Sequence, residues 1–214
     1  MTPEATPIRL LAAALAALAL GAVPFSWLLG RLRGVDLRAT GSGNVGATNL
    51  TRAAGTGFGM LGLILDASKG AAAVLLARWL AGEGTPWAPA LAGSIAVVAH
   101  SFTPFLRFRG GKGVATGAGV FAVLAPKAVA AALVMFAIAF ALTRIVAAGS
   151  LVAAIVLPAA IFWLSPDRSA AFAAAVLGIL VIARHRDNIR RMIAGHEHRL
   201  EGGPRGGARK GGPG

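Results

Sequence analysis

The chain contains no cysteine among its 214 residues, and only 14% of its residues are charged. The absence of cysteine excludes disulfide bonds and thiolate metal sites. The low charge content argues against an ordinary soluble domain, in which about 25% of residues are charged. Hydrophobic residues make up 56% of the chain, and the mean hydropathy is +0.71. These values predict an integral membrane protein, and the length favours a single domain.

Histidine and acidic residues are also scarce. Of the four histidines, only His196 and His198 are close in sequence, and no pair has the spacing of metal ligands. We therefore expect no metal site and no cofactor. Eight Asp and Glu residues stand against 21 Lys and Arg, which gives a net charge of +13. No pattern resembles a Ser-His-Asp triad or a catalytic carboxylate pair.

Long apolar runs are plentiful, and about twenty apolar residues cross the hydrocarbon core as a helix. The runs cover residues 8–29, 57–80, 87–106, 114–142, 145–164 and 169–183. The first run is longer than the apolar region of a signal peptide, which has about 7–15 residues. We therefore expect a retained transmembrane helix there, with a cleaved signal peptide as the alternative.

The fourth run decides the number of spans. It is too long for one ordinary span, and Pro126 and Lys127 lie near its middle, where proline breaks a helix and lysine disfavours lipid. Splitting it gives seven spans and places sixteen of the 21 Lys and Arg residues on one side. We therefore predict an all-α polytopic protein with seven transmembrane helices, the N-terminus outside and the C-terminus cytoplasmic.

The charge distribution and the absence of repeats narrow the function. Residues 1–200 are expected to form one transmembrane domain, and residues 201–214 a disordered, basic, Gly-rich tail that can touch anionic lipid. The basic loops hold few aromatic side chains, so we expect no nucleic-acid partner. The chain has no internal repeat, which weakens a transporter interpretation.

The first polar segment, residues 41–49, crowds glycines with small hydrogen-bonding side chains after an apolar run. Glycine lets a backbone approach a ligand and point successive N–H groups at it, so the segment predicts a phosphate cradle. The dinucleotide fingerprint that its glycines also match is rejected, because no strand precedes it. The residues expected to contact substrate are Ser42, Gly43, Asn44, Gly46, Thr48, Asn49 and the following Arg52.

Two further polar segments fall on the same predicted side. In the second, Gly110, Gly111 and Gly113 surround Lys112 at the start of a span, where helix N–H groups attract anions and Thr116 adds a hydroxyl. Its alternative is a tight turn with a lysine that reaches the membrane surface. The third segment places its polar residues on one face of a helix that continues the last span, and its alternative is a basic helix resting on lipid headgroups. The residues on this face are His185, Asn188 and Arg191 or Met192, and Glu197 follows further along the segment.

Additional polar residues lie within or between the predicted spans. Asp66 and Lys69 are one helical turn apart inside the second span, as a structural ion pair or as part of the site. His100, near the end of the third span, is expected to be an interfacial hydrogen-bonding residue rather than a catalyst. Arg144 and Ser150 lie in the remaining cytoplasmic turn and are expected to complete a phosphate-binding shell.

Together the three segments resemble motifs of the bacterial integral-membrane acyl-phosphate:glycerol-3-phosphate acyltransferases. The matches are Ser-Gly-Asn-x-Gly-Ala-Thr-Asn at 42–49, Gly-Gly-Lys-Gly-Val-Ala-Thr at 110–116 and His-x-x-Asn-Ile-x-Arg at 185–191, with Gly195 and Glu197 beyond. The resemblance covers about residues 8–200. Ala22 and Ala147 stand where relatives often carry serine, and the tail matches nothing recognised.

This resemblance implies an enzyme of phospholipid biosynthesis in the bacterial inner membrane, with its site on the cytoplasmic face. Acyl phosphate gives its acyl group to glycerol 3-phosphate, which yields lysophosphatidic acid and phosphate, and refusal of acyl-CoA or acyl carrier protein is implied in the same way. Ser42, Lys112 and His185 are the catalytic candidates. The proton acceptor is either His185, oriented by Glu197, or a substrate phosphate, which we favour. We expect membrane lipid but no obligatory protein partner.

Two other functions were weighed. A transporter or channel for an organic phosphate would place its polar groups near the bilayer midplane along a path. A non-catalytic lipid-binding scaffold would explain the basic loops, but it would leave the three glycine-rich and polar motifs without a role. The clustering of these motifs in end loops on one side favours the enzyme.

Overall fold

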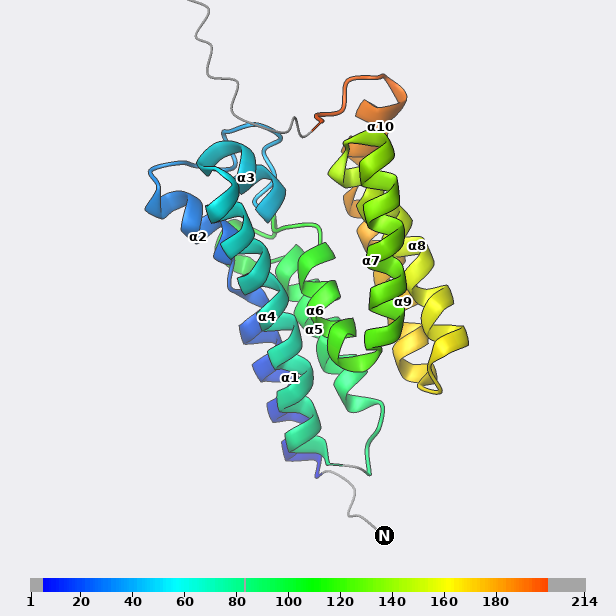
Figure 1. The fold of residues 1–214 in the computed structure, drawn as a ribbon. Coiled ribbons are helices and arrows are strands. Elements are labelled where there is room, and N and C mark those ends of the chain that lie inside the picture. The colour runs from blue at the N-terminus through cyan, green and yellow to red at the C-terminus, as the bar shows by residue number, and fades with distance from the viewer. Residues whose placement is uncertain (1–5, 83, 200–214) are drawn as a thin grey trace, which may run out of the picture.

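The computed structural model describes residues 6–82 and 84–199, which are helical with connecting turns and contain no strand (Figure 1). The predicted tail at 201–214 lies outside the described residues. The helices are α1 (Pro7–Ala22), α2 (Phe25–Leu32), α3 (Ala47–Ala54), α4 (Thr56–Ala81), α5 (Ala88–Ser101), the 3-10 helix η1 (Pro104–Leu106), α6 (Val114–Leu124), α7 (Pro126–Thr143), α8 (Val146–Leu164), α9 (Arg168–Arg184) and α10 (Arg186–Ile193).

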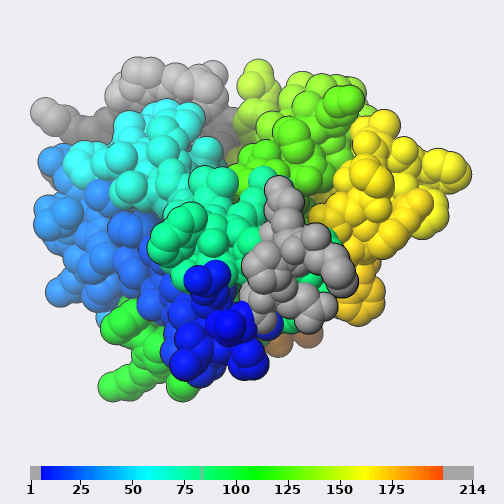
Figure 2. Space-filling view, turned by 90° about the horizontal axis from the view of Figure 1, so that it is seen from below, coloured from blue at the N-terminus to red at the C-terminus, as the bar shows by residue number. Residues whose placement is uncertain are grey.

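The helices form two groups. In the first, α1 packs on α4 and α5, and α4 packs on α6; in the second, α8 packs between α7 and α9. The groups meet where α5 and α6 contact α9 and where α6 leads into α7. In Figure 1, α2 and α3 lie at the upper left and α10 at the upper right, and α1 begins at the opposite end of the molecule. Figure 2, seen from that opposite end, shows α1 (blue) well apart from the α8–α9 turn (yellow).

The predicted division of the run at 114–142 is confirmed, because α6 ends at Leu124 and Pro126 begins α7. Helix α6 has 11 residues and a length of roughly 16 Å, about half of the hydrocarbon core. Five helical segments within the described residues are long and apolar enough to cross a membrane, or six if α9 and α10, bent by 56°, are one span. The total of seven spans and their orientation remain predictions.

The apolar run at residues 8–29, expected to be one transmembrane helix, is interrupted between α1 and α2. Pro24 has no N–H group, and α1 ends two residues before it, at Ala22. Two side chains from distant parts of the chain satisfy carbonyl groups at this break: Lys69 Nζ on α4 donates to Val23 O at 2.6 Å, and Thr103 Oγ1 in the turn before η1 donates to Ala22 O at 2.6 Å. The two halves still form one apolar stretch long enough for a span.

Small residues allow the helices to approach closely, as is common in membrane bundles. A Cβ atom at Gly21 would overlap the backbone of Ala96, and one at Gly119 would overlap the backbone of Ala67. Larger side chains fill the space between α4, α5, α6, α8 and α9, where Phe121 is buried. This packing fixes the ends of α4, α6 and α9, to which the three polar segments are connected along the chain.

Candidate active site

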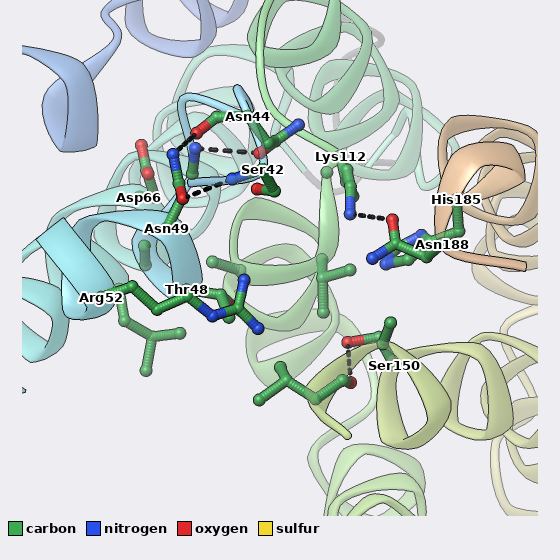
Figure 3. A pocket seen from close by; sticks show the side chains of 18 of the residues that line it. Ser42, Asn44, Thr48, Asn49, Arg52, Asp66, Lys112, Ser150, His185 and Asn188 are labelled. Atoms are coloured by element: carbon green, nitrogen blue, oxygen red, sulfur yellow. Dashed lines mark hydrogen bonds between the residues drawn. The ribbon is translucent and has the colours of Figure 1, made fainter. Parts of the chain in front are cut away.

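The three polar segments predicted from the sequence meet around one cavity of about 130 Å³, the polar pocket (Figure 3). It opens between the two helix groups. Its walls come from the loop at 42–49, the start of α6, the α9–α10 bend and the ends of α4, α5 and α8. The lining residues are Ser42, Asn44, Gly46, Ala47, Thr48, Asn49, Arg52, Leu63, Asp66, His100, Lys112, Gly113, Val114, Ala115, Phe136, Val146, Ala147, Ser150, His185, Asn188 and Glu197.

Asn49 organises the first loop from within. Its Nδ2 donates to the carbonyl oxygens of Leu37 at 3.0 Å, Thr40 at 2.9 Å and Asn44 at 2.9 Å, and its Oδ1 accepts from Ser42 N at 3.1 Å. The residue is 2% exposed. The side-chain amide is therefore occupied by loop backbone, so Asn49 shapes the cradle instead of offering its amide to a ligand.

Two turns of this loop need glycine or a short polar side chain. Gly41 and Gly43 have φ values of 57° and 69°, which L side chains rarely adopt. Asn44 Oδ1 accepts from Gly46 N at 2.9 Å, which closes the next turn. The loop leads into α3, from which Arg52 extends toward the middle of the polar pocket (Figure 3).

The glycines before Lys112 serve close packing. Gly110 N donates to Ser101 O at 3.1 Å, and Gly111 N donates to His100 O at 3.3 Å. These N–H groups are therefore not free to bind phosphate, which differs from the prediction made from the sequence. A Cβ atom at Gly110 would overlap the His100 carbonyl, and one at Gly111 would overlap the His100 ring. The N–H groups available to an anion are instead those of the first turn of α6, which lines the pocket.

Lys112 reaches across the polar pocket from this loop, and its Nζ donates to Asn188 Oδ1 on α10. Burial lowers the pKa of the Lys112 ammonium from 10.5 to about 8. The carboxylate of Glu197 opposes this shift, and the positive charges of Arg191 and Arg52 reinforce it. Lys112 is therefore a cation at neutral pH that gains from an incoming anion.

The third segment is ordered by a buried carboxylate. Glu197, 7% exposed, accepts from Asn188 Nδ2 at 2.9 Å and from Arg191 Nε at 2.8 Å. His185 is 2% exposed, and its Nδ1 lies 2.8 Å from Val181 O, so Nδ1 carries a hydrogen and Nε2 is the free acceptor. The hydrogen-bond partner of His185 Nδ1 is thus the Val181 carbonyl, and the hydrogen bonds of Glu197 go to Asn188 and Arg191, so the orientation of His185 by Glu197 stays a prediction.

Asp66 and Lys69 form a structural ion pair, and Asp66 also lines the polar pocket. Lys69 Nζ lies 3.0 Å from Asp66 Oδ1 and 2.9 Å from His100 Nδ1, and Ser26 Oγ donates to Asp66 Oδ2 at 2.7 Å. This buried cluster supports the α1–α2 break, while Asp66 and His100 form part of the pocket wall. His100 is buried at 7% exposure, packs against Gly111 and contacts Lys69 through Nδ1, so it is a hydrogen-bonding residue of this cluster.

Five of the residues expected to bind substrate do not line the polar pocket: Gly43, Gly110, Gly111, Thr116 and Arg144. Arg144 is exposed at the α7–α8 turn, and Thr116 is fully buried on the face of α6 that packs against Gly70. Ser150 does line it, and its Oγ donates to Val146 O at 2.9 Å. No cluster of metal-ligating side chains occurs within residues 6–82 and 84–199.

A second, apolar pocket of about 270 Å³ adjoins the first. It lies between the two helix groups and is walled by residues of α4 through α9, among them Phe121 and Leu177. The two pockets share Leu63, Gly113, Val114, Ala115, Phe136 and Ser150. Gly113 and Ser150 were predicted from the sequence. The apolar residues Leu63, Val114, Ala115 and Phe136 were missed as site residues, because nothing distinguishes them from the rest of a hydrophobic helix.

The charges in the polar pocket favour anions. Glu197 is paired with Arg191, and Asp66 is paired with Lys69. Lys112 faces a neutral amide, and Arg52 Nη2 donates to the carbonyl oxygen of His198 at 3.3 Å. Two cations thus face the cavity without an ion-pair partner among the described residues. A site of this kind can hold phosphate groups beside an apolar chain.

Comparison with known proteins adds independent information. The family model described as glycerol-3-phosphate acyltransferase matches residues 11–195. Curated relatives of that name include one from Anaeromyxobacter dehalogenans strain 2CP-1, 45% identical over 94% of this chain and 100% of its own length. Glycerol-3-phosphate acyltransferase 1 of Deinococcus radiodurans is 47% identical over 85% of this chain and 90% of its own length.

Two crystal structures of PlsY (YgiH), an integral membrane glycerol 3-phosphate acyltransferase, share the fold. The glycerol 3-phosphate form has a TM-score of 0.85 and 37% identity, and covers 90% of this chain and 96% of its own. The lysophosphatidic acid form has a TM-score of 0.82 and 36% identity, with 90% and 95% coverage.

Proposed function

Because the chain belongs to the glycerol-3-phosphate acyltransferase family, we propose that it uses acyl phosphate as donor and forms lysophosphatidic acid and phosphate. The observation that carries the choice of substrates is the junction of a cationic polar pocket with an apolar pocket. The donor and the product each combine a phosphate with a long acyl chain, and the acceptor is a small phosphate ester. The reacting carbonyl then lies where the two pockets share their wall.

The two phosphates occupy the polar pocket. Arg52 and Lys112 neutralise them, and the free N–H groups of the first turn of α6 add directed donors. Ser42 and Thr48, from the loop that Asn49 shapes, supply hydroxyl groups on the same wall. The donor's acyl chain extends into the apolar pocket between α4, α6, α7, α8 and α9.

The chemistry is an acyl transfer between oxygens. A hydroxyl oxygen of glycerol 3-phosphate attacks the carbonyl carbon of the donor, and the bond from that carbon to the phosphate oxygen breaks. The departing phosphate takes the bonding electrons, and Lys112 and Arg52 stabilise its charge. Positioning and charge stabilisation therefore supply most of the catalysis.

We propose that a substrate phosphate oxygen receives the hydroxyl proton, since a phosphate with a second pKa near 6 is a workable base at neutral pH. His185 contacts the Val181 backbone through Nδ1, and none of its described hydrogen bonds or ion pairs is to a carboxylate; Glu197 binds Asn188 and Arg191. His185→Ala should accordingly lower kcat by less than about tenfold. A loss of about 10²–10⁴-fold would instead assign the general base to His185.

We place the polar pocket on the cytoplasmic face of the bacterial inner membrane, with seven crossings, the N-terminus outside and residues 1–200 as one domain. The basic segments that predict this orientation carry the pocket residues: Arg52 lies on α3, and Lys112 contacts Asn188 on α10. Soluble glycerol 3-phosphate then enters from the cytoplasm, and the donor enters from the membrane between the helices.

The activity is tested by release of inorganic phosphate from an acyl phosphate, using the purified protein in detergent. Release that depends on glycerol 3-phosphate, with an equal amount of lysophosphatidic acid formed, is the expected result. Acyl-CoA and acyl carrier protein donors should give no product. A transporter of organic phosphate or a lipid-binding scaffold would release no phosphate, so either would overturn the proposal.

Lys112→Ala should abolish this activity while the protein still inserts into membranes. The matched control is Lys127→Ala, because Lys127 is exposed in the first turn of α7 and does not line the polar pocket. Ser42→Ala and Arg52→Ala should also cause severe losses. Turnover retained by Lys112→Ala would refute the assigned role of this lysine.

A further inference from the structure

Arg184, the last residue of α9, binds the backbone of the Lys112 loop, which comprises residues 107–113. Its Nη2 donates to Gly110 O at 2.8 Å and to Gly111 O at 3.2 Å, and its Nε donates to Gly111 O at 3.3 Å. The guanidinium carbon also lies 5.3 Å from the centre of the Phe102 ring, a cation–π distance. One side chain thus connects the second polar segment to the start of the third.

Arg184 is not among the residues that line the polar pocket. Its guanidinium is directed at carbonyl oxygens and an aromatic ring, and no carboxylate lies within ion-pair distance of it in the described part of the chain. A contact with substrate therefore does not explain this arginine. Lipid headgroups, the partner that the sequence suggested for the basic residues here, do not explain these inward contacts either.

We propose that Arg184 is a positioning residue: it holds the Lys112 loop against the α9–α10 bend so that the Lys112 ammonium faces the phosphate groups. Lys112 directly follows the two carbonyl groups that Arg184 binds. Its partner Asn188 lies one turn beyond Arg184, on α10. Arg184 therefore fixes the register between the two segments that Lys112 bridges.

The loop is held from the other side as well. Gly110 and Gly111 donate to carbonyl groups at the end of α5, and Gly111 packs against the His100 ring without room for a Cβ atom. Arg184 binds the same two peptide units from α9. The loop thus lies between α5 and α9, and Arg184 makes all of its described hydrogen bonds to α9. Removing that arginine frees the loop on the side that faces Asn188.

The planar guanidinium suits two neighbouring carbonyl groups, because it presents several donors in a fixed fork. A lysine at 184 keeps the charge but offers a single ammonium, so it can replace only part of this grip. Arg184→Lys should therefore retain more activity than Arg184→Ala and less than the unchanged protein. A role limited to charge at the membrane surface would instead make Arg184→Lys fully active.

The first test measures kcat/KM for glycerol 3-phosphate in Arg184→Ala, Arg184→Lys and the control Arg186→Ala. Arg186 is exposed and contacts only Asp187 among acidic residues. Because displacement of a catalytic group by about 1 Å can lower rates about 10²-fold, we expect losses of about 10² and 10¹ for the first two variants. The control should stay within about threefold. Arg184→Ala within threefold of the unchanged protein would overturn the proposal.

The second test needs no turnover and separates positioning from general destabilisation. The chain has four lysines, so ¹³C-dimethylated lysine signals can be resolved by NMR, and Lys112→Arg assigns the Lys112 signal. Release of the loop exposes Lys112 to water, which relieves the burial that lowers its pKa and therefore raises that pKa. We expect an upward shift of about one pH unit in Arg184→Ala. Glu197, Arg191, Arg52 and Asp187, the charges acting on Lys112, are unchanged in this variant.

A third measurement keeps the idea testable if acyl transfer, on which the activity readout rests, is not observed. Inorganic phosphate binding is measured by calorimetry for Arg184→Ala, Lys112→Ala and the double variant. If Arg184 acts through Lys112, the Arg184→Ala substitution should weaken phosphate binding only in protein that retains Lys112. Equal weakening in both backgrounds, or an unshifted Lys112 titration in folded Arg184→Ala, contradicts the proposal. If Arg184→Ala is not monodisperse, Arg184→Gln takes its place in all three measurements.

Discussion

Raising the pH should switch off the enzyme through Lys112 before the protein loses its fold. The Lys112 pKa is about 8 in the unliganded protein. With that value about nine tenths of Lys112 is charged at pH 7 and about one tenth at pH 9. If the ammonium is required to bind and stabilise phosphate, kcat/KM should fall about tenfold between these pH values, because kcat/KM reports the pKa of the free enzyme.

Unfolding would not imitate this loss. Lys112 has a lower pKa in the folded protein than its ordinary value of 10.5, so folding disfavours its protonated form. Deprotonation between pH 8 and 10.5 therefore removes a destabilising contribution, and the Lys112 part of the folding free energy becomes more favourable as the pH rises. Activity and this part of the stability change in opposite directions across the same window.

The assay follows phosphate release from pH 6 to 10, corrected for spontaneous hydrolysis of the donor, together with thermal unfolding at each pH. Lys112→Arg is the informative variant, because a guanidinium stays protonated throughout this range. Whatever activity it retains should lack the decline near pH 8. A decline that persists unchanged in Lys112→Arg, or its absence from the unchanged protein up to pH 10, would refute the assignment to Lys112.

Three further outcomes follow from the contacts around the pockets. Asn49→Ala removes four hydrogen bonds within the first loop, a local cost of roughly 3 kcal/mol. It should raise KM for glycerol 3-phosphate and speed amide hydrogen exchange at residues 37–46, and Asn44→Ala, which removes one such bond, should have a smaller effect on both. Gly117 lines the apolar pocket and has open space where a Cβ would lie. Gly117→Leu should therefore shift the donor preference toward shorter acyl chains without changing KM for glycerol 3-phosphate, and Gly117→Ala is the size control. Arg144→Gly should keep turnover within about threefold in the same assay, because Arg144 is exposed, lies outside the pocket and has a φ of 61° that glycine tolerates.

Local chemistry in the sequence was enough to predict several features. Pro126 marks the division between α6 and α7, and apolar length marks the candidate spans. Charge placement put the three polar segments on one side, and the structure brings Ser42, Lys112 and Asn188 to one cavity. Each of these inferences depends on a property of one stretch of chain or on a rule that applies to whole loops.

The remaining features depend on contacts between distant residues and backbone atoms. Arg184 binds the carbonyl groups of Gly110 and Gly111, and carbonyl groups occur at every residue, so no sequence pattern identifies this partner. Asn49 likewise uses its amide on loop carbonyls, and Gly111 is required by the His100 ring. Motif glycines and amides that suggest ligand contacts can thus serve to place other groups.

The central claim is that three distant segments form one pocket on the inner face of the membrane. Because the chain has no cysteine, single cysteines can be introduced at exposed positions of these segments, namely Ala39, Arg109 and Asp187, with Pro166 at the opposite end as the reference. A membrane-impermeant maleimide applied to intact cells should label only Pro166→Cys, and the other three should react only after permeabilisation. Labelling of any one of those three from outside would contradict the shared pocket.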